Sequence, residues 1–183
     1  MIRSDSPIRA QEIVKRLPTD RPLVGVEVGA AFGDTSRYLL ANRPNLTHHI
    51  VDPWSHPDRV RDEWAVICAA QVAPFGDRCI IHRVNSTEGP ALVPGMVDFV
   101  FIDAVHKYPN CKEDAAAWWP KIKPGGFLVF HDYGFNPAGG PAFLGVARAV
   151  NEFIGTTARK YTMPVQTGAD DTIFVWKPKE AQP

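Results

Sequence analysis

Polar side chains recur where the sequence predicts that buried strands end. The first such place is the run V-E-V-G-A-A-F-G-D-T, residues 26–35, in which Glu27 precedes a turn bracketed by Gly29 and Gly33. A dinucleotide-binding turn reads G-x-G-x-x-G and holds a pyrophosphate at a helix N-terminus. Here the pattern is E-x-G-x-x-x-G, with a carboxylate and two glycines. Such a turn suits a ligand that carries an ammonium group and a sulfonium better than one that carries phosphates.

The second predicted strand ends at Asp52, about 20 residues after Gly29, the spacing expected of an acid that binds ribose hydroxyls. A carboxylate there can accept from two hydroxyls at once. The simpler alternative is that Asp52 and Pro53 only start a turn. Trp54 either offers a flat face to adenine or covers the core, and the sequence leaves these two interpretations level. Ser86 follows the third predicted strand.

Two further strand ends are acidic. Asp103 ends the run V-D-F-V-F-I-D, and the pair His131 and Asp132 follows F-L-V-F. One acid at a strand end is commonplace because it can cap the next helix, but a series of them is harder to explain by capping. In an open parallel sheet, ligands bind beyond the carboxyl ends of the strands. The sequence therefore predicts one ligand site along this edge.

The elements that position these residues alternate between strand and helix, which predicts an α/β fold. We expect a Rossmann-like, doubly wound, mostly parallel seven-stranded sheet with helices on both faces. The whole chain, residues 1–183, is interpreted as one domain, with an N-terminal helix segment at 1–20 and a tail at 178–183. The predicted strands are 23–28, 48–52, 79–84, 97–103, 127–131, 161–164 and 172–177, and the predicted helices are 8–17, 34–42, 59–73, 109–121 and 141–154.

Composition narrows the function classes. The formal net charge is zero at pH 7, so the chain has no electrostatic footprint for nucleic acid or an anionic membrane. No apolar run approaches the roughly 20 residues that span a bilayer, and residues 1–7 lack the apolar core of a secretory signal. The three cysteines are odd in number and far apart, which indicates neither a disulfide framework nor a metal site. We expect a cytoplasmic protein.

Residues 24–35 resemble motif I of class I S-adenosylmethionine-dependent methyltransferases. The segments D-F-V-F-I-D-A-V-H-K-Y (98–108) and W-W-P-K-I-K-P-G-G-F-L-V-F-H-D-Y (118–133) are similar to those of a subgroup that includes macrocin-type sugar O-methyltransferases and cephalosporin-hydroxylase-like proteins. The resemblance covers about residues 20–155. It implies that S-adenosylmethionine binds at the residues Glu27, Gly29, Gly33, Thr35, Asp52, Trp54, Ser86 and Asp103.

In metal-dependent members of this family, the positions of Asp103, His131 and Asp132 bind Mg²⁺. Mg²⁺ prefers oxygen ligands, so Asp103 and Asp132 suit it, whereas His131 favours a transition metal. The alternative is that His131 and Asp132 only position the cofactor or end the strand. The resemblance thus leaves a divalent cation as an open possibility.

His106 is the candidate general base, because it lies three residues past Asp103 in a loop at the ligand edge and its ordinary pKa suits proton removal near neutral pH. The macrocin-type enzymes place an aspartate base at the position of Val105, so that base is missing here. The alternative is that His106 stacks on the cofactor or caps the next helix. Lys107 and Tyr108 are weaker candidates for substrate contact.

The leading interpretation is methyl transfer to a small-molecule hydroxyl, of a sugar or a secondary metabolite. A nucleotide-binding module of the same fold without methyl transfer is the alternative, and an NAD-dependent oxidoreductase is disfavoured by the missing third glycine. We expect Glu27 near the methionine end of the cofactor, and a side chain at Gly29 to block the ligand's path. Residues 53–63 and 133–140 are the predicted substrate walls, and a second subunit, in a homodimer, could complete the pocket.

Overall fold

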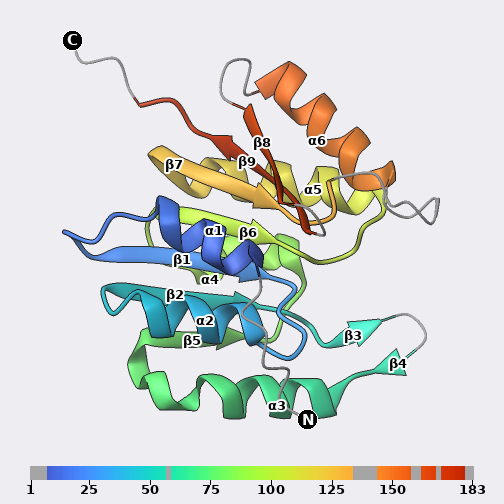
Figure 1. Cartoon of the computed structure of the whole chain (residues 1–183). Helices are drawn as coiled ribbons and strands as arrows, with labels where there is room; N and C mark the ends of the chain where they lie inside the picture. Colours follow the sequence, from blue (N-terminus) through green and yellow to red (C-terminus); the bar gives the residue numbers. More distant parts are fainter. Residues whose placement is uncertain (1–7, 57–58, 134–143, 158–161, 168–169, 180–183) are drawn as a thin grey trace.

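The computed structural model describes residues 8–56, 59–133, 144–157, 162–167 and 170–179. Its main sheet consists of β1 (Leu23–Val28), β2 (Leu46–Val51), β5 (Cys79–His82), β6 (Val97–Ile102), β7 (Ile122–Phe130), β8 (Thr162–Thr167) and β9 (Asp170–Trp176). The strand order is β5-β2-β1-β6-β7-β9-β8 (Figure 1). The first five are parallel, whereas β9 runs antiparallel to β7 and to β8. The order reverses between β1 and β6, and the carboxyl ends of the parallel strands share one edge there.

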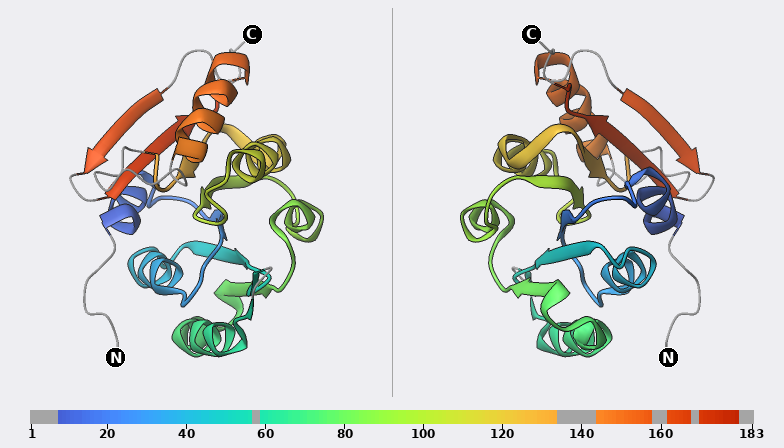
Figure 2. Two further views of the ribbon diagram at one scale, coloured as in Figure 1. Left: turned by 90° about the vertical axis from the view of Figure 1, so that its right-hand side faces the viewer. Right: turned by 90° about the vertical axis from the view of Figure 1, so that its left-hand side faces the viewer.

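Helices cover both faces of this sheet (Figure 2). One face carries α1 (Ile8–Arg16), α2 (Asp34–Asn42) and α3 (Asp62–Val72), and the other carries α4 (Gly89–Leu92), α5 (Tyr108–Trp118) and α6 (Leu144–Thr157). Ile13 of α1 packs with Phe99 on the first face, and Trp118 of α5 packs with Val100 on the second. Because both faces are covered, every residue of β6 is buried, as expected of a central parallel strand. Among the described helices, none has the length and apolar character that a membrane crossing requires.

The predicted fold class and order of elements are confirmed, and strand 23–28 and helix 34–42 have the predicted bounds. The predicted helix over 59–73 is wrong at its start. Residues 59–60 form β4 (Arg59–Val60), which pairs with β3 (Ser55–His56). The helix begins at Asp62, where two consecutive acids suit the positive helix end.

Other boundaries also moved. β5 ends at His82, two residues before the predicted end. β7 begins at Ile122 rather than at residue 127, because the P-G-G segment, residues 124–126, stays in the strand and shifts the register with β6. Residues 141–143 and 161, which the predicted elements include, lie outside the described part of the chain.

Candidate active site

The glycine loop, residues 29–33, joins β1 to α2 at the shared edge of the sheet. Gly29 and Gly33 have φ angles of +86° and +85°, in the left-handed region that favours glycine. A Cβ on Gly29 would lie 2.2 Å from the backbone oxygen of Asp103. A side chain at Gly29 would therefore meet the backbone after β6, an obstacle that the sequence analysis did not foresee. The expected block of the ligand's path stays a prediction.

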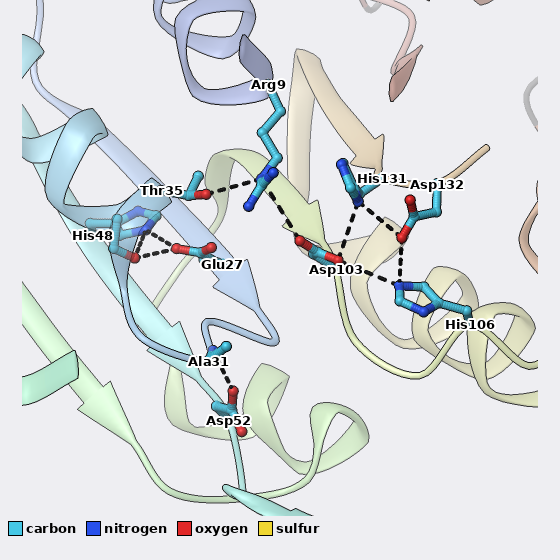
Figure 3. A network of polar contacts seen from close by, with 11 residues as sticks. Arg9, Glu27, Ala31, Thr35, His48, Asp52, Asp103, His106, His131 and Asp132 are labelled. Carbon is cyan, nitrogen blue, oxygen red and sulfur yellow. Dashed lines mark hydrogen bonds and ion pairs between the residues drawn. The ribbon is translucent and has the colours of Figure 1, made fainter. Parts of the chain in front are cut away.

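Asp52 and Trp54, after β2, hold the glycine loop. Asp52 Oδ2 accepts a hydrogen bond from the Ala31 N–H at 3.0 Å (Figure 3), and its Oδ1 accepts one from the Trp54 N–H at 2.7 Å. The Trp54 indole N–H donates to the Ala31 carbonyl oxygen at 2.8 Å. Ala31, at a φ of 48°, is thus fixed through both its backbone groups in a conformation that residues other than glycine seldom adopt.

Trp54 is only 3% exposed, and its ring packs with Leu40, Ile50 and Cys68. Of the two interpretations that the sequence leaves level, this burial favours the one in which the indole covers the core. Ser86 begins the short helical turn η2 (Ser86–Glu88) and contacts α5. Its hydroxyl accepts a hydrogen bond from the Trp118 indole at 3.2 Å and also bonds to Asp114.

Glu27 and two other buried polar residues link β1, α2 and β2. The Glu27 carboxylate, 2% exposed, accepts a short hydrogen bond from the Ser36 hydroxyl. His48 Nε2 lies 3.0 Å from the same hydroxyl and 3.8 Å from Glu27 Oε2 (Figure 3). The strand-end acid of motif I is therefore tied into the interior, directly beneath the glycine loop.

Four side chains converge where β6 and β7 end (Figure 3). His106 Nε2 lies 2.9 Å from Asp132 Oδ2 and 3.5 Å from Asp103 Oδ1. His131 Nδ1 lies 3.0 Å from the same Asp132 oxygen and 3.4 Å from the same Asp103 oxygen. Asp132 has a φ of 56°, and such strained residues other than glycine cluster at functional sites. We call Asp103, His106, His131 and Asp132 the strand-end cluster.

The strand-end cluster couples two acids to two imidazoles, and this shifts their pKa values. Hydrogen bonds to Asp103 and Asp132 raise the pKa of His106 to about 9, although burial opposes the shift. Burial would raise the pKa of Asp132, but hydrogen bonds from His106 and His131 lower it to about 2. The pKa of Asp103 is lowered for the same reasons. The expectation that His106 titrates at an ordinary histidine pKa is therefore wrong for this arrangement.

Arg9 is a site residue that the sequence analysis did not single out. Its guanidinium Nε donates to Thr35 Oγ1 at 3.2 Å and lies 3.8 Å from Asp103 Oδ2. Most of α1, all of β1 and the glycine loop separate Arg9 from Thr35 in the sequence, and Asp103 lies further along still. No local spacing therefore signals either contact. Thr35 itself is buried, at 2% exposure.

Tyr108, one of the weaker candidates for substrate contact, is the first residue of α5. The Tyr108 hydroxyl donates a short hydrogen bond to Glu152, and the Arg148 guanidinium stacks on the Tyr108 ring at 4.0 Å, so this tyrosine links α5 to α6. Of the predicted substrate walls, residues 57–58 and 134–140 lie outside the described part of the chain.

The sheet order, the glycine loop after β1, the acid after β2 and the strand-end cluster together define a class I methyltransferase fold. The chain belongs to the methyltransferase domain family: the family model described as "Methyltransferase domain" matches residues 26–133, more than half of the chain. None of the curated proteins compared with the chain matches it.

Several solved structures share the fold. An O-methyltransferase from Bacillus cereus, solved with S-adenosylhomocysteine, is 16% identical with a TM-score of 0.72, covering 97% of this chain and 84% of that one. A Staphylococcus aureus protein provisionally named a caffeoyl-CoA O-methyltransferase is 13% identical with a TM-score of 0.73, covering 94% and 84%. The O-methyltransferase TomG from Streptomyces achromogenes, solved with S-adenosylmethionine, is 17% identical with a TM-score of 0.65, covering 93% and 78%. At these identities the likeness concerns the fold.

Proposed function

We propose that the protein transfers the methyl group of S-adenosylmethionine to a hydroxyl oxygen of a small molecule. The observation that carries the proposal is the strand-end cluster, which gathers two acids and two imidazoles beside the glycine loop. The sulfonium already activates the methyl group, so the tasks left to the protein are to align the acceptor and to take its proton. Membership of the methyltransferase family supports this reaction class, and the ligands of the B. cereus protein and TomG support the cofactor.

In this proposal the cofactor lies across the glycine loop with its ribose at Asp52. Each Asp52 oxygen accepts one backbone hydrogen bond and has a second lone pair for a ribose hydroxyl. Gly29 and Gly33 bring the backbone close to the ligand. Ser86 lies on the adenine side, after β5, and Trp54 acts by holding the loop.

The methionine arm is proposed to lie between the end of β1 and the end of β6, near Glu27, Thr35 and Asp103. The buried carboxylate of Glu27 contributes negative potential toward the ammonium group and the sulfonium, and its bond from Ser36 keeps it in place. The transferable methyl then faces the strand-end cluster.

His106 is proposed to take the proton of the acceptor hydroxyl. With its pKa raised to about 9 between two carboxylates, the imidazole carries a proton at neutral pH in the arrangement described. The fraction of His106 in the neutral form, which can act as a base, therefore increases as pH rises. It also increases when added positive charge at Asp103 and Asp132 lowers the pKa of His106. The transfer rate is accordingly expected to increase from pH 7 toward pH 9 in protein treated with a chelator.

Asp103, His131 and Asp132 also fit a divalent cation. One ligand atom from each lies within 4.8 Å of the others. Two carboxylates and an imidazole form a donor set that a first-row transition ion suits better than Mg²⁺, which prefers oxygen alone. Such an ion, when bound, supplies Lewis-acid stabilisation of an acceptor oxyanion.

For the acceptor, we propose a sugar or secondary-metabolite hydroxyl. The support is the similarity of residues 98–108 and 118–133 to macrocin-type enzymes, with the difference that Val105 stands where those enzymes have an aspartate. The proton-accepting role then falls to His106, one residue further along the loop.

The test is transfer of a labelled methyl group from S-adenosylmethionine to a panel of sugars and phenols, with Mg²⁺, with Mn²⁺, and with EDTA. We expect labelled product from wild-type protein and a loss of at least about 10²-fold in Asp103→Asn. Asp77→Asn is the matched control, because Asp77 is an exposed acid just before β5 and outside the predicted substrate walls. Calorimetry with S-adenosylhomocysteine and NAD identifies the cofactor: binding of S-adenosylhomocysteine without transfer to any acceptor would favour a binding module, and binding of NAD alone would contradict the proposal.

A further inference from the structure

Arg9 brings a fixed positive charge to an edge of the sheet that is otherwise rich in acids. Glu27 lies next to the last residue of β1, and Asp52, Asp103 and Asp132 follow β2, β6 and β7 at this edge. Figure 3 shows the Arg9 side chain reaching from α1 into the space between α2 and the end of β6. The side chain is a quarter exposed.

The charges of the proposed cofactor explain why such a cation is needed. Acids suit the sulfonium and the ammonium group of S-adenosylmethionine, but the third charge of its methionine arm is a carboxylate. Next to several acids, that carboxylate would be repelled unless a cation stands beside it. Arginine suits this task, because its planar guanidinium presents donors in a fork that matches a carboxylate and stays charged at every relevant pH.

The contacts of Arg9 place it where the carboxylate would lie. Its Nε is anchored at 3.2 Å on the hydroxyl of Thr35, in the first turn of α2. That helix begins after Gly33, which has no side chain to bind the first backbone N–H groups, so the helix end adds donors and a positive dipole at the same place. The Arg9 Nε lies 3.8 Å from Asp103 Oδ2, so the two groups attract each other without a direct hydrogen bond between these atoms.

We propose that Arg9 binds the α-carboxylate of the methionine arm and so selects methyl donors that carry this group. The inference rests on the proposed function, because it assigns a residue to one part of the same cofactor. Thr35 then acts through Arg9, as a positioning residue, and α1 becomes a wall of the cofactor site.

The test compares S-adenosylmethionine with decarboxylated S-adenosylmethionine, two ligands that differ by the carboxylate alone. Calorimetry of the full chain is expected to show that wild-type protein prefers the first by at least tenfold. Arg9→Gln is expected to weaken binding of S-adenosylmethionine by about 10- to 100-fold, the range of a lost charge-assisted hydrogen bond. Its affinity for the decarboxylated ligand should stay within about twofold of wild type.

Lys15→Gln is the matched control, since it removes one positive charge from the same helix at an exposed position paired with Glu12. It should leave both affinities unchanged, and Arg9→Lys should recover part of the preference. An equal loss for both ligands in Arg9→Gln would show that Arg9 only supports the site and would overturn the inference. Equal binding of both ligands by wild-type protein would overturn it too while leaving the proposed function intact. Failure of wild-type protein to bind either ligand would instead overturn the proposed function.

Discussion

Asp52 is expected to stabilise the fold and to bind the cofactor. Substitution of Asp52 should therefore have larger effects on stability and on cofactor affinity than substitution of an ordinary surface acid. Each of its oxygens accepts a hydrogen bond from a backbone N–H, of Ala31 and of Trp54. Asp52→Ala removes both bonds and leaves Ala31 and Trp54, at φ angles of 48° and 45°, without their anchor. Asp52→Asn keeps one accepting oxygen but places an amide NH₂ group against an N–H donor.

The size of the effect follows from these two bonds. A hydrogen bond to a charged group contributes about 1.5–3 kcal/mol. The two bonds together give about 3–6 kcal/mol. Because Asp52 is partly exposed and solvent weakens such bonds, we expect about 2–4 kcal/mol of unfolding free energy to be lost in Asp52→Ala, and about 1–3 kcal/mol in Asp52→Asn, which keeps one accepting oxygen. Loss of the ribose contact should also weaken binding of S-adenosylmethionine by at least about tenfold in both variants.

Urea unfolding followed by tryptophan fluorescence measures the first effect, and calorimetry measures the second. The control is Asp62→Asn, since Asp62 pairs with Arg83 on the surface and should contribute no more than about 1 kcal/mol. Wild-type stability in Asp52→Ala would refute the role of the two backbone bonds. Weakened folding with unchanged cofactor affinity would confine Asp52 to the loop and remove its assignment to the ribose.

Three further predictions concern stability. Gly29→Ala should lower the free energy of unfolding, measured in urea, by at least about 2 kcal/mol. Gly76 is also at positive φ but has nothing within 4 Å of an added Cβ, so Gly76→Ala should cost only about 1–2 kcal/mol. Equal losses in the two variants would exclude the backbone clash. Burial and the neighbouring His82 lower the pKa of His49 to about 4. As pH falls, the unfolded chain therefore binds the proton before the folded one does. The free energy of unfolding should decrease by up to about 3 kcal/mol as pH falls from about 6.5 to 4. His49→Gln should lose much of this slope in urea unfolding across that range. Burial raises the pKa of Asp114 to about 6, so the ionised side chain destabilises the fold increasingly as pH rises from about 4 to 6. Asp114→Asn should therefore be more stable than wild type at pH 7, by up to about 3 kcal/mol. Equal thermal midpoints of the two proteins would contradict this.

The edge of the sheet that holds the site could be predicted from the sequence because strand ends are local features. An apolar run that stops at Asp103 or at His131 marks its own carboxyl end, and the alternation of strands and helices makes the strands parallel. Parallel neighbours then bring their ends together, as the pairing of β6 with β7 shows. The prediction that Asp103 and Asp132 open onto one site followed from this rule and the expected adjacency of the two strands, whereas their grouping with His131 as a metal set came from the family resemblance.

The partners of individual side chains could not be predicted in the same way, because they depend on contacts between distant segments. Glu27 sits in a strand pattern that says nothing of Ser36 on the next helix or His48 on the next strand. The sequence left the direction of the Trp54 ring open, because its packing with Leu40 of α2 and Cys68 of α3 depends on how those helices dock. Arg9 occurs in an amphipathic helix with several charged residues, and the sequence does not show which of them faces the site once the helix packs on the sheet.

The pKa of His106 illustrates how such contacts change a chemical conclusion. A histidine alone in a loop is half-neutral near pH 6.5 and could serve as a base without help. Bringing Asp132 to 2.9 Å and Asp103 to 3.5 Å stabilises the imidazolium, so the proximity that assembles the site also weakens the base at neutral pH. Catalysis at pH 7 then requires positive charge that competes for the two carboxylates, and the strand-end cluster offers Asp103, His131 and Asp132 as the place for it. This competition predicts the pH profile of methyl transfer. In chelator, the rate should rise with pH around pH 9, and addition of a divalent ion should move this rise to lower pH. A rise that stays at the same pH would mean that His106 is not the group that loses the proton.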